Sequence, residues 1–170
     1  MIPGAMALLA ALTGQADPDP LAPAARGEVQ CTMPDKAAKT CFAITIYTRT
    51  AGGFDSVTTM MLSPDPLVTI EMAAPGTVEG NAICGVVTRE QMAAAKVSVG
   101  GVALPPEQAA PILEQMMAVV APTFGRKTCT RYRPEGDLLI AETEVEGVRD
   151  PQMTLPTMWV KPADGYRVGG

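Results

Sequence analysis

Histidine is absent from this chain of 170 residues. It is the most frequent general base in enzymes and the most frequent metal-binding side chain in proteins. Its absence excludes an active site of the serine–histidine–aspartate type and removes a common ligand of zinc centres. A glycine-rich phosphate loop and a dinucleotide-binding fingerprint are absent as well. We therefore expect a protein that is not an enzyme and that holds no cofactor or metal ion.

Aromatic residues are scarce, at 4% of the chain, whereas hydrophobic residues make up 47%. A core must therefore be built from aliphatic side chains and from the 11 methionines, which fill irregular spaces well. Positive charge is scarce too. The 13 lysines and arginines are outnumbered by 18 aspartates and glutamates, which gives a formal net charge of −5. Nucleic-acid binding requires a basic surface. We expect no nucleic-acid partner.

Apolar runs of transmembrane length are also missing, since a bilayer requires about 20 apolar residues. Residues 4–13 form a shorter apolar run with the length of a signal-peptide core, and Gly14 and Ala16 are small residues suited to cleavage after position 16. No lysine or arginine precedes the run, and a buried N-terminal helix is the alternative. We predict a signal peptide over residues 1–16, a flexible Pro/Ala-rich arm over 17–30 and a single domain over 31–170. The mature chain is then secreted or periplasmic, with no transmembrane segment.

The four cysteines carry the strongest signal that is present. An even number of cysteines in an exported chain predicts disulfide bonds, and sequence alone permits three pairings of Cys31, Cys41, Cys84 and Cys129. We favour Cys31–Cys41, which closes a short polar loop, and Cys84–Cys129, which joins two predicted strands. A metal site is the alternative, but the spacings do not match those of structural zinc sites. No Cys-x-x-Cys redox pair is present.

Hydrophobic periodicity predicts strands and two helices. Strands are expected over residues 41–50, 54–62, 67–72, 77–87, 126–133, 137–146 and 158–161, in hairpins that favour an antiparallel sheet. Thr88 and Gln91 fit a capping box before a helix over residues 89–96. An apolar stripe predicts a second helix over residues 106–120. The expected fold is α+β: a single antiparallel sheet of about six or seven strands, with two helices packed on one face and disulfides as staples.

Glu142, Glu144 and Glu146 alternate along a predicted strand and therefore point to one side. A row of this kind can form a cation site, or two of its carboxylates can act in glycoside hydrolysis. A solvated sheet face, paired with basic residues of the neighbouring strand, is the interpretation we favour.

Methionine pairs and the single tryptophan are the remaining candidates. Met116 and Met117 fall on the apolar stripe of the second predicted helix, where they fit a core or the lining of an apolar ligand site. Clustered thioethers can also bind copper(I). Trp159 could line the same ligand site.

These features predict an exported, non-catalytic binding or structural domain that holds a small amphiphile or apolar ligand, or an envelope protein partner. The alternatives are a carboxylate-based hydrolase and a copper(I)-handling protein.

Overall fold

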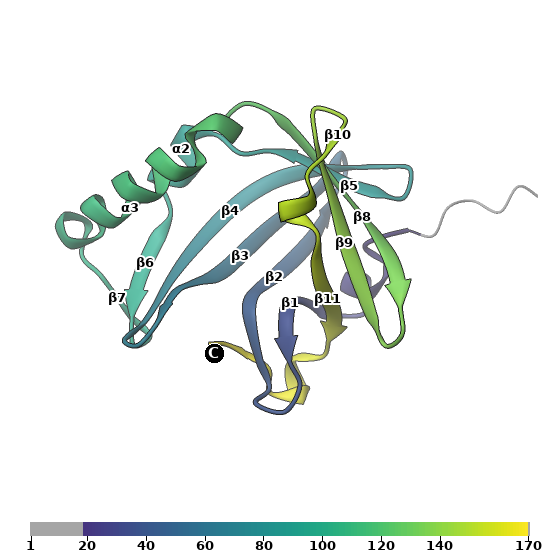
Figure 1. Cartoon of the computed structure of the whole chain (residues 1–170), viewed down its shortest axis with the longest axis horizontal. Helices are drawn as coiled ribbons and strands as arrows, with labels where there is room; N and C mark the ends of the chain where they lie inside the picture. The colour runs from purple at the N-terminus through teal and green to yellow at the C-terminus, as the bar shows by residue number, and fades with distance from the viewer. Residues whose placement is uncertain (1–18, 170) are drawn as a thin grey trace, which may run out of the picture.

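Eight antiparallel strands close into a cylinder in the computed structural model, which describes residues 19–169 (Figure 1). The pairing can be followed from β1 through β2, β3, β4, β5, β8, β9 and β11 back to β1. We call this closed ring the strand cylinder. Closing a sheet removes the unpaired edges that an open sheet exposes. A ring of eight strands is just wide enough to be filled by side chains or to hold one small ligand.

The strands of the cylinder differ in length, and two of them extend beyond it. The bounds are β1 (Val29–Asp35), β2 (Thr40–Thr50), β3 (Gly53–Pro64), β4 (Leu67–Glu79), β5 (Ala82–Val86), β8 (Lys127–Glu135), β9 (Leu138–Val145) and β11 (Leu155–Val160). The long strands β3 and β4 continue past the ring, where β4 pairs with β6 (Lys96–Val99) and β6 pairs with β7 (Val102–Ala103). Two further short strands are β10 (Val148–Arg149), which pairs with β9, and β12 (Arg167–Val168), which lies parallel to β2.

Two of the helices lie in the long connection between β5 and β8. They are α2 (Arg89–Ala93) and α3 (Pro106–Val120), and Figure 1 shows both over the extended part of β4 and β6. A short helix, α1 (Ala22–Ala25), precedes β1. Single 3₁₀ turns follow α3, β10 and β11, namely η1 (Ala121–Thr123), η2 (Pro151–Met153) and η3 (Pro162–Asp164). None of the helices in residues 19–169 is long and apolar enough to cross a membrane.

The expected α+β fold with a single sheet of six or seven strands is wrong. The described residues are mostly β, with 54% in strands and twelve strands in one large sheet. Pro75 and Gly76 do not separate two strands, because β4 continues through them to Glu79. The polar loop expected after Cys31 is shorter than predicted, because residues up to Asp35 belong to β1 and only residues 36–39 form the turn. Residues 97–104, expected to form a connector or a short strand, belong to the β6–β7 hairpin.

The local predictions with the clearest periodicity are confirmed. The helix predicted over residues 106–120 is α3, with the same bounds. The predicted capping box at α2 is present. The backbone N–H of Gln91 donates to Thr88 Oγ1 at 3.2 Å, and the backbone N–H of Thr88 donates to Gln91 Oε1 at 2.9 Å. The predicted signal peptide, residues 1–16, lies outside the described residues. In the stretch 17–30, α1 and the start of β1 are formed, and Leu21 is fully buried.

The main apolar core lies between the helices and the extended part of β3 and β4. Its buried members come from β4, β6, α2 and α3: Ile70, Met92, Ala95, Val97, Ala109 and Leu113. Met60 and Leu62 of β3, together with Met116 and Met117 of α3, pack against them. We call this region the helix-covered core. A second, smaller cluster surrounds Cys31, Cys41 and Val160 and includes Tyr166 near the C-terminal end.

Candidate functional site

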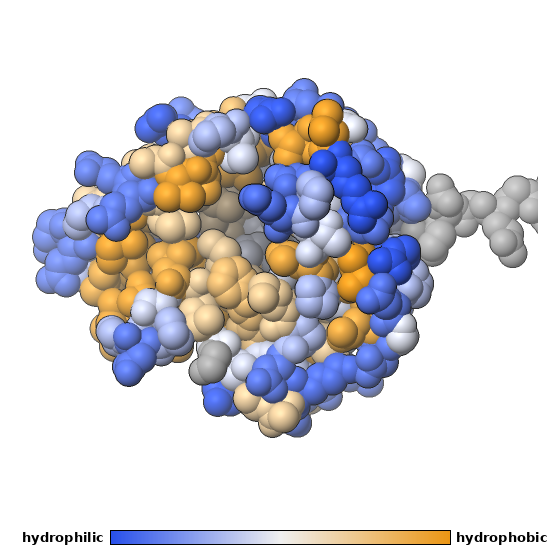
Figure 2. Space-filling model, viewed as in Figure 1, coloured by the Kyte–Doolittle hydropathy of each residue, from blue (hydrophilic) through white to orange (hydrophobic). Residues whose placement is uncertain are grey.

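A cavity of about 240 Å³ lies inside the strand cylinder. Its lining extends from β2, β3, β4, β5, β8 and β9 to Thr123 of η1 and Met153 of η2. Figure 2 shows a hollow between α3 and the η2 segment, with apolar side chains on the α3 side and polar side chains toward η2. The cavity therefore opens at the end of the cylinder where η1 and η2 lie.

The lining combines apolar groups with hydroxyl groups and contains no charged side chain among the described residues. The larger apolar members are Phe54, Ile83, Val86, Val145 and Met153. The hydroxyl members are Thr45, Tyr47, Ser56, Thr58, Thr123, Thr128 and Thr130. Apolar walls with a few fixed polar groups are characteristic of small-molecule sites.

Strand alternation places the hydroxyl groups inside. Successive side chains of a strand point to opposite faces, so Thr128 and Thr130 share the inner face of β8 while Cys129 points outward. Cross-strand register then sets threonines opposite each other. Thr45 and Thr58 pair between β2 and β3, with their Oγ1 atoms 3.0 Å apart, and Thr130 and Thr143 pair between β8 and β9 at 2.9 Å.

The two threonine pairs lie on opposite walls of the cylinder. In the ring order β1, β2, β3, β4, β5, β8, β9, β11, the strand β8 is four places from β2, and β9 is four places from β3. Two residues further along β2 and β8, in the same direction, are Tyr47 and Tyr132. The interior is thus layered, with threonines nearer the opening and tyrosines deeper.

Tyr47, Tyr132 and Gln30 form the deeper layer, which we call the tyrosine floor. The Tyr47 hydroxyl donates to Gln30 Oε1 at 3.2 Å. Burial raises the pKa of Tyr47 well above its ordinary value, and the neighbouring Tyr132 adds to this rise. Burial also raises the pKa of Tyr132, an effect that its neighbours Gln30 and Tyr47 partly offset. Both phenols therefore remain protonated and uncharged at neutral pH.

Aromatic rings line one side of the cavity. The ring centroids of Tyr47 and Phe54 are 5.3 Å apart in an edge-to-face arrangement, and those of Tyr47 and Trp159 are 5.7 Å apart. Gly76 of β4 makes room for Phe54, because a Cβ atom at Gly76 would lie 2.3 Å from Cζ of the phenyl ring. Gly76, which lies between the strands expected over 67–72 and 77–87, is thus required by close packing against the cavity wall.

The three sequence-predicted lining residues occupy different places. Met116 and Met117 pack against the helix-covered core and are not part of the cavity lining. Trp159 contacts Tyr47 but lines a smaller pocket of about 220 Å³ at the other end of the cylinder, with Tyr132 and Leu139. Residues of the segment that includes α1, among them Pro20 and Pro23, close that end.

The predicted carboxylate row is at the outer surface of the cylinder. Glu144 forms an ion pair with Arg131 at 2.9 Å, and Glu142 forms one with Arg149 at 2.7 Å. Glu146 follows the end of β9 and accepts a hydrogen bond from the Lys127 backbone amide. These contacts are those of a solvated, charge-paired sheet face, and none of the three glutamates lines the cavity.

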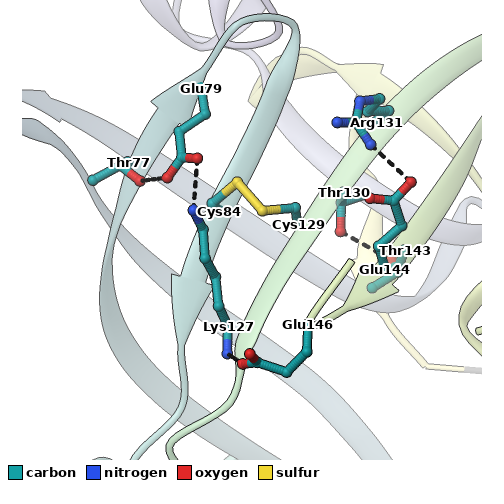
Figure 3. The surroundings of a disulfide bond; sticks show 10 residues. All are labelled: Thr77, Glu79, Cys84, Lys127, Cys129, Thr130, Arg131, Thr143, Glu144 and Glu146. Atoms are coloured by element: carbon teal, nitrogen blue, oxygen red, sulfur yellow. Dashed lines mark hydrogen bonds and ion pairs between the residues drawn. A yellow bond between two sulfur atoms is a disulfide. The ribbon is translucent and has the colours of Figure 1, made fainter. Parts of the chain in front are cut away.

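The favoured cysteine pairing is the one in the structure. Disulfides join Cys31 to Cys41 and Cys84 to Cys129. Cys84 and Cys129 are register partners on β5 and β8, and Figure 3 shows their disulfide between the Lys127–Glu79 and Arg131–Glu144 ion pairs. Glu79 lies close to both sulfur atoms, but cysteines in a disulfide offer no thiolate to a metal ion. Two disulfides are consistent with an extracellular or periplasmic protein.

Sequence reasoning missed the cavity residues although a signal was present. Thr45 and Tyr47 alternate on one strand, and Thr128, Thr130 and Tyr132 alternate on another. Such rows are as regular as the apolar rows on which the strand predictions depended. They were not recognised because polar residues on a strand are ordinarily assigned to the solvent side.

Comparisons with protein-family models, with curated proteins and with solved structures found no match for this chain.

Proposed function

We propose that this chain is an exported binding protein that holds a small, largely apolar molecule inside the strand cylinder. The single observation that carries the proposal is the cavity of about 240 Å³ in the ring of strands, open at one end. A packed interior normally contains few voids larger than a water molecule. A cavity of this size is therefore a feature that needs a function.

Small side chains support the proposal, because they are what keeps the interior open. Ser56, Ala74 and Gly85 line the cavity on three neighbouring strands, where larger residues would fill it. The opening between η1 and η2 gives a ligand a route from solvent. The surrounding strands are fixed by closure of the ring and by the Cys84–Cys129 disulfide, so the site is preformed. Preformed sites bind with a smaller ordering cost.

Location and chemistry also agree with a binding role outside the cytoplasm. Both disulfides would be maintained in a secreted or periplasmic protein, where thiols are oxidised. Among the described residues, the lining offers hydroxyls and apolar surface but no carboxylate, amine or guanidinium group. A small apolar ligand or an amphiphile fits such a lining.

Binding can be tested with N-phenyl-1-naphthylamine, an uncharged probe that fluoresces in apolar surroundings. We expect saturable binding by the disulfide-bonded protein. In Thr58→Leu, the added side chain enters the cavity, and we expect affinity to fall by about tenfold or more. Thr59→Leu is the matched control, because the next residue of the same strand points to the opposite face. Absence of saturable probe binding, or equal losses in both variants, would contradict the proposal.

Native mass spectrometry provides an independent measurement. Protein purified from its own compartment without denaturation is expected to carry a bound small molecule, seen as an added mass that is lost on unfolding. Thr58→Leu should carry less of it than Thr59→Leu.

A further inference from the structure

We propose that the cavity selects an uncharged molecule that carries a hydroxyl or carbonyl group, and that this group lies against one of the two threonine pairs above the tyrosine floor. This inference rests on the proposed function and names the ligand class for the same cavity. A medium-chain alcohol is the simplest member of the class. The corresponding carboxylate and ammonium compounds are excluded.

The first argument is the lack of charge in the lining. None of the described residues that surround the cavity is acidic or basic. The basic side chains of β8 are engaged on the outer surface, as in the pairs Arg131–Glu144 and Lys127–Glu79. An ionised group that leaves water needs an opposite charge or several charge-assisted hydrogen bonds in its new surroundings. The interior offers no opposite charge.

The second argument is the hydrogen-bonding capacity that the threonines retain. A hydroxyl has one proton to donate and two lone pairs to accept. In each threonine pair, a single hydrogen bond joins the two oxygen atoms, so each pair keeps one donor and further acceptor sites. A polar group of the ligand beside either pair can therefore donate to that pair and accept from it. A ligand hydroxyl can do both, and a carbonyl can accept.

The tyrosine floor provides the third argument. Tyr47 and Tyr132 remain uncharged, so the floor neither repels nor attracts an ion at neutral pH. Gln30 is 6% exposed, and its Nε2 atom has no hydrogen-bond partner among the described residues. The amide therefore adds a donor to the layer below the threonines. The surroundings favour a neutral group that accepts hydrogen bonds.

The apolar members of the lining determine where the rest of the ligand lies. Val145, Val86 and Met153 are nearer the opening than the threonine pairs, since Val145 is two residues from Thr143 toward the end of β9 and Met153 belongs to η2. An alkyl chain that extends from the threonines toward the opening would contact these side chains. The polar end enters first, and the apolar end faces the hollow shown in Figure 2.

The test compares octan-1-ol, octanoate and octylammonium at pH 7 by isothermal titration calorimetry and by displacement of N-phenyl-1-naphthylamine. The three have the same chain length and differ in the charge of the end group. We expect octan-1-ol to bind about tenfold or more tightly than either ion. Equal or tighter binding of octanoate or octylammonium would overturn the inference and leave the proposed function intact. If neither the probe nor any of the three compounds binds, the proposed function fails as well.

Threonine variants locate the polar group. In Thr45→Val/Thr58→Val, both hydroxyls of one pair are replaced by methyl groups of similar volume, and no hydroxyl is left without its partner. If the polar group lies against this pair, octan-1-ol affinity falls by about tenfold while probe affinity stays within about twofold. Thr130→Val/Thr143→Val tests the opposite wall in the same way. Thr48→Val, at an exposed position of β2, is the control. Unchanged octan-1-ol affinity in both double variants would contradict the assigned position of the group.

Discussion

The strands β3 and β4 have one inner face that serves two different purposes along its length. In the extended part, Met60 lies opposite Ile70, and the helices cover both. In the cylinder, Ser56 lies opposite Ala74, and both line the cavity. The same backbone arrangement thus supports a packed core at one end and an open space at the other. Side-chain size, together with the presence or absence of a covering helix, distinguishes the two regions.

The largest effect that we predict on the free energy of unfolding concerns the disulfide that holds the helical segment against the cylinder. Cys84 and Cys129 are 45 residues apart, and the segment between them contains α2, β6, β7 and α3. The disulfide therefore holds the whole helical connection against the cylinder. Replacing both cysteines with alanine should lower the free energy of unfolding by about 4 kcal/mol, from the chain entropy of a loop of this length. Urea unfolding monitored by circular dichroism measures the change.

The Cys31–Cys41 disulfide is the matched control for that prediction. Its cysteines are only 10 residues apart. The corresponding double alanine variant should lose about 3 kcal/mol, because closing a shorter loop restricts the unfolded chain less. A larger loss from the short loop than from the long one would show that loop entropy does not account for the difference.

Packing in the two regions can be compared directly by truncating one side chain in each. Ile70 is 2% exposed in the helix-covered core, and Ile70→Ala should lower the free energy of unfolding by about 3 kcal/mol through lost burial and the cavity left behind. Thr58 faces a space that is already open, so Thr58→Ala should cost only about 1 kcal/mol, mainly for its hydrogen bond to Thr45. Urea unfolding of both variants measures the ratio. Equal losses would mean that the cylinder interior is as tightly packed as the helical core.

Much of this organisation was predictable where the signal is local. The stripe of Ile112, Leu113 and Met116 defined α3, and Thr88 with Gln91 defined the start of α2. The favoured disulfides were found because each joins plausible neighbours. These features depend on residues close in sequence, or on the few pairings that four cysteines allow.

Closure of the cylinder was not predictable from the same information. It depends on pairing β1 with β11, where Val29 is the partner of Val160 at the other end of the domain. Hydrophobic alternation also predicts the wrong buried face for part of β2. Ile46 is 51% exposed, whereas its neighbour Thr45 is 7% exposed and faces the cavity. A polar interior reverses the pattern that usually identifies the buried face of a strand.

The last prediction concerns the tyrosine floor. It distinguishes the floor from the helix-covered core, in which no described tyrosine takes part. The pKa values of Tyr47 and Tyr132 are raised above 10.0 in the folded protein. Above pH 10 the unfolded chain therefore loses phenolic protons that the folded chain keeps, and stability falls as pH rises. We expect these two residues to make the free energy of unfolding fall as the pH rises from 9 to 10.5, measured by urea unfolding. Tyr47→Phe/Tyr132→Phe should remove that part of the pH dependence, whereas Ile70→Ala should lower stability equally at both pH values. An unchanged pH dependence in the double phenylalanine variant would mean that the phenols of the floor titrate alike in the folded and unfolded chains.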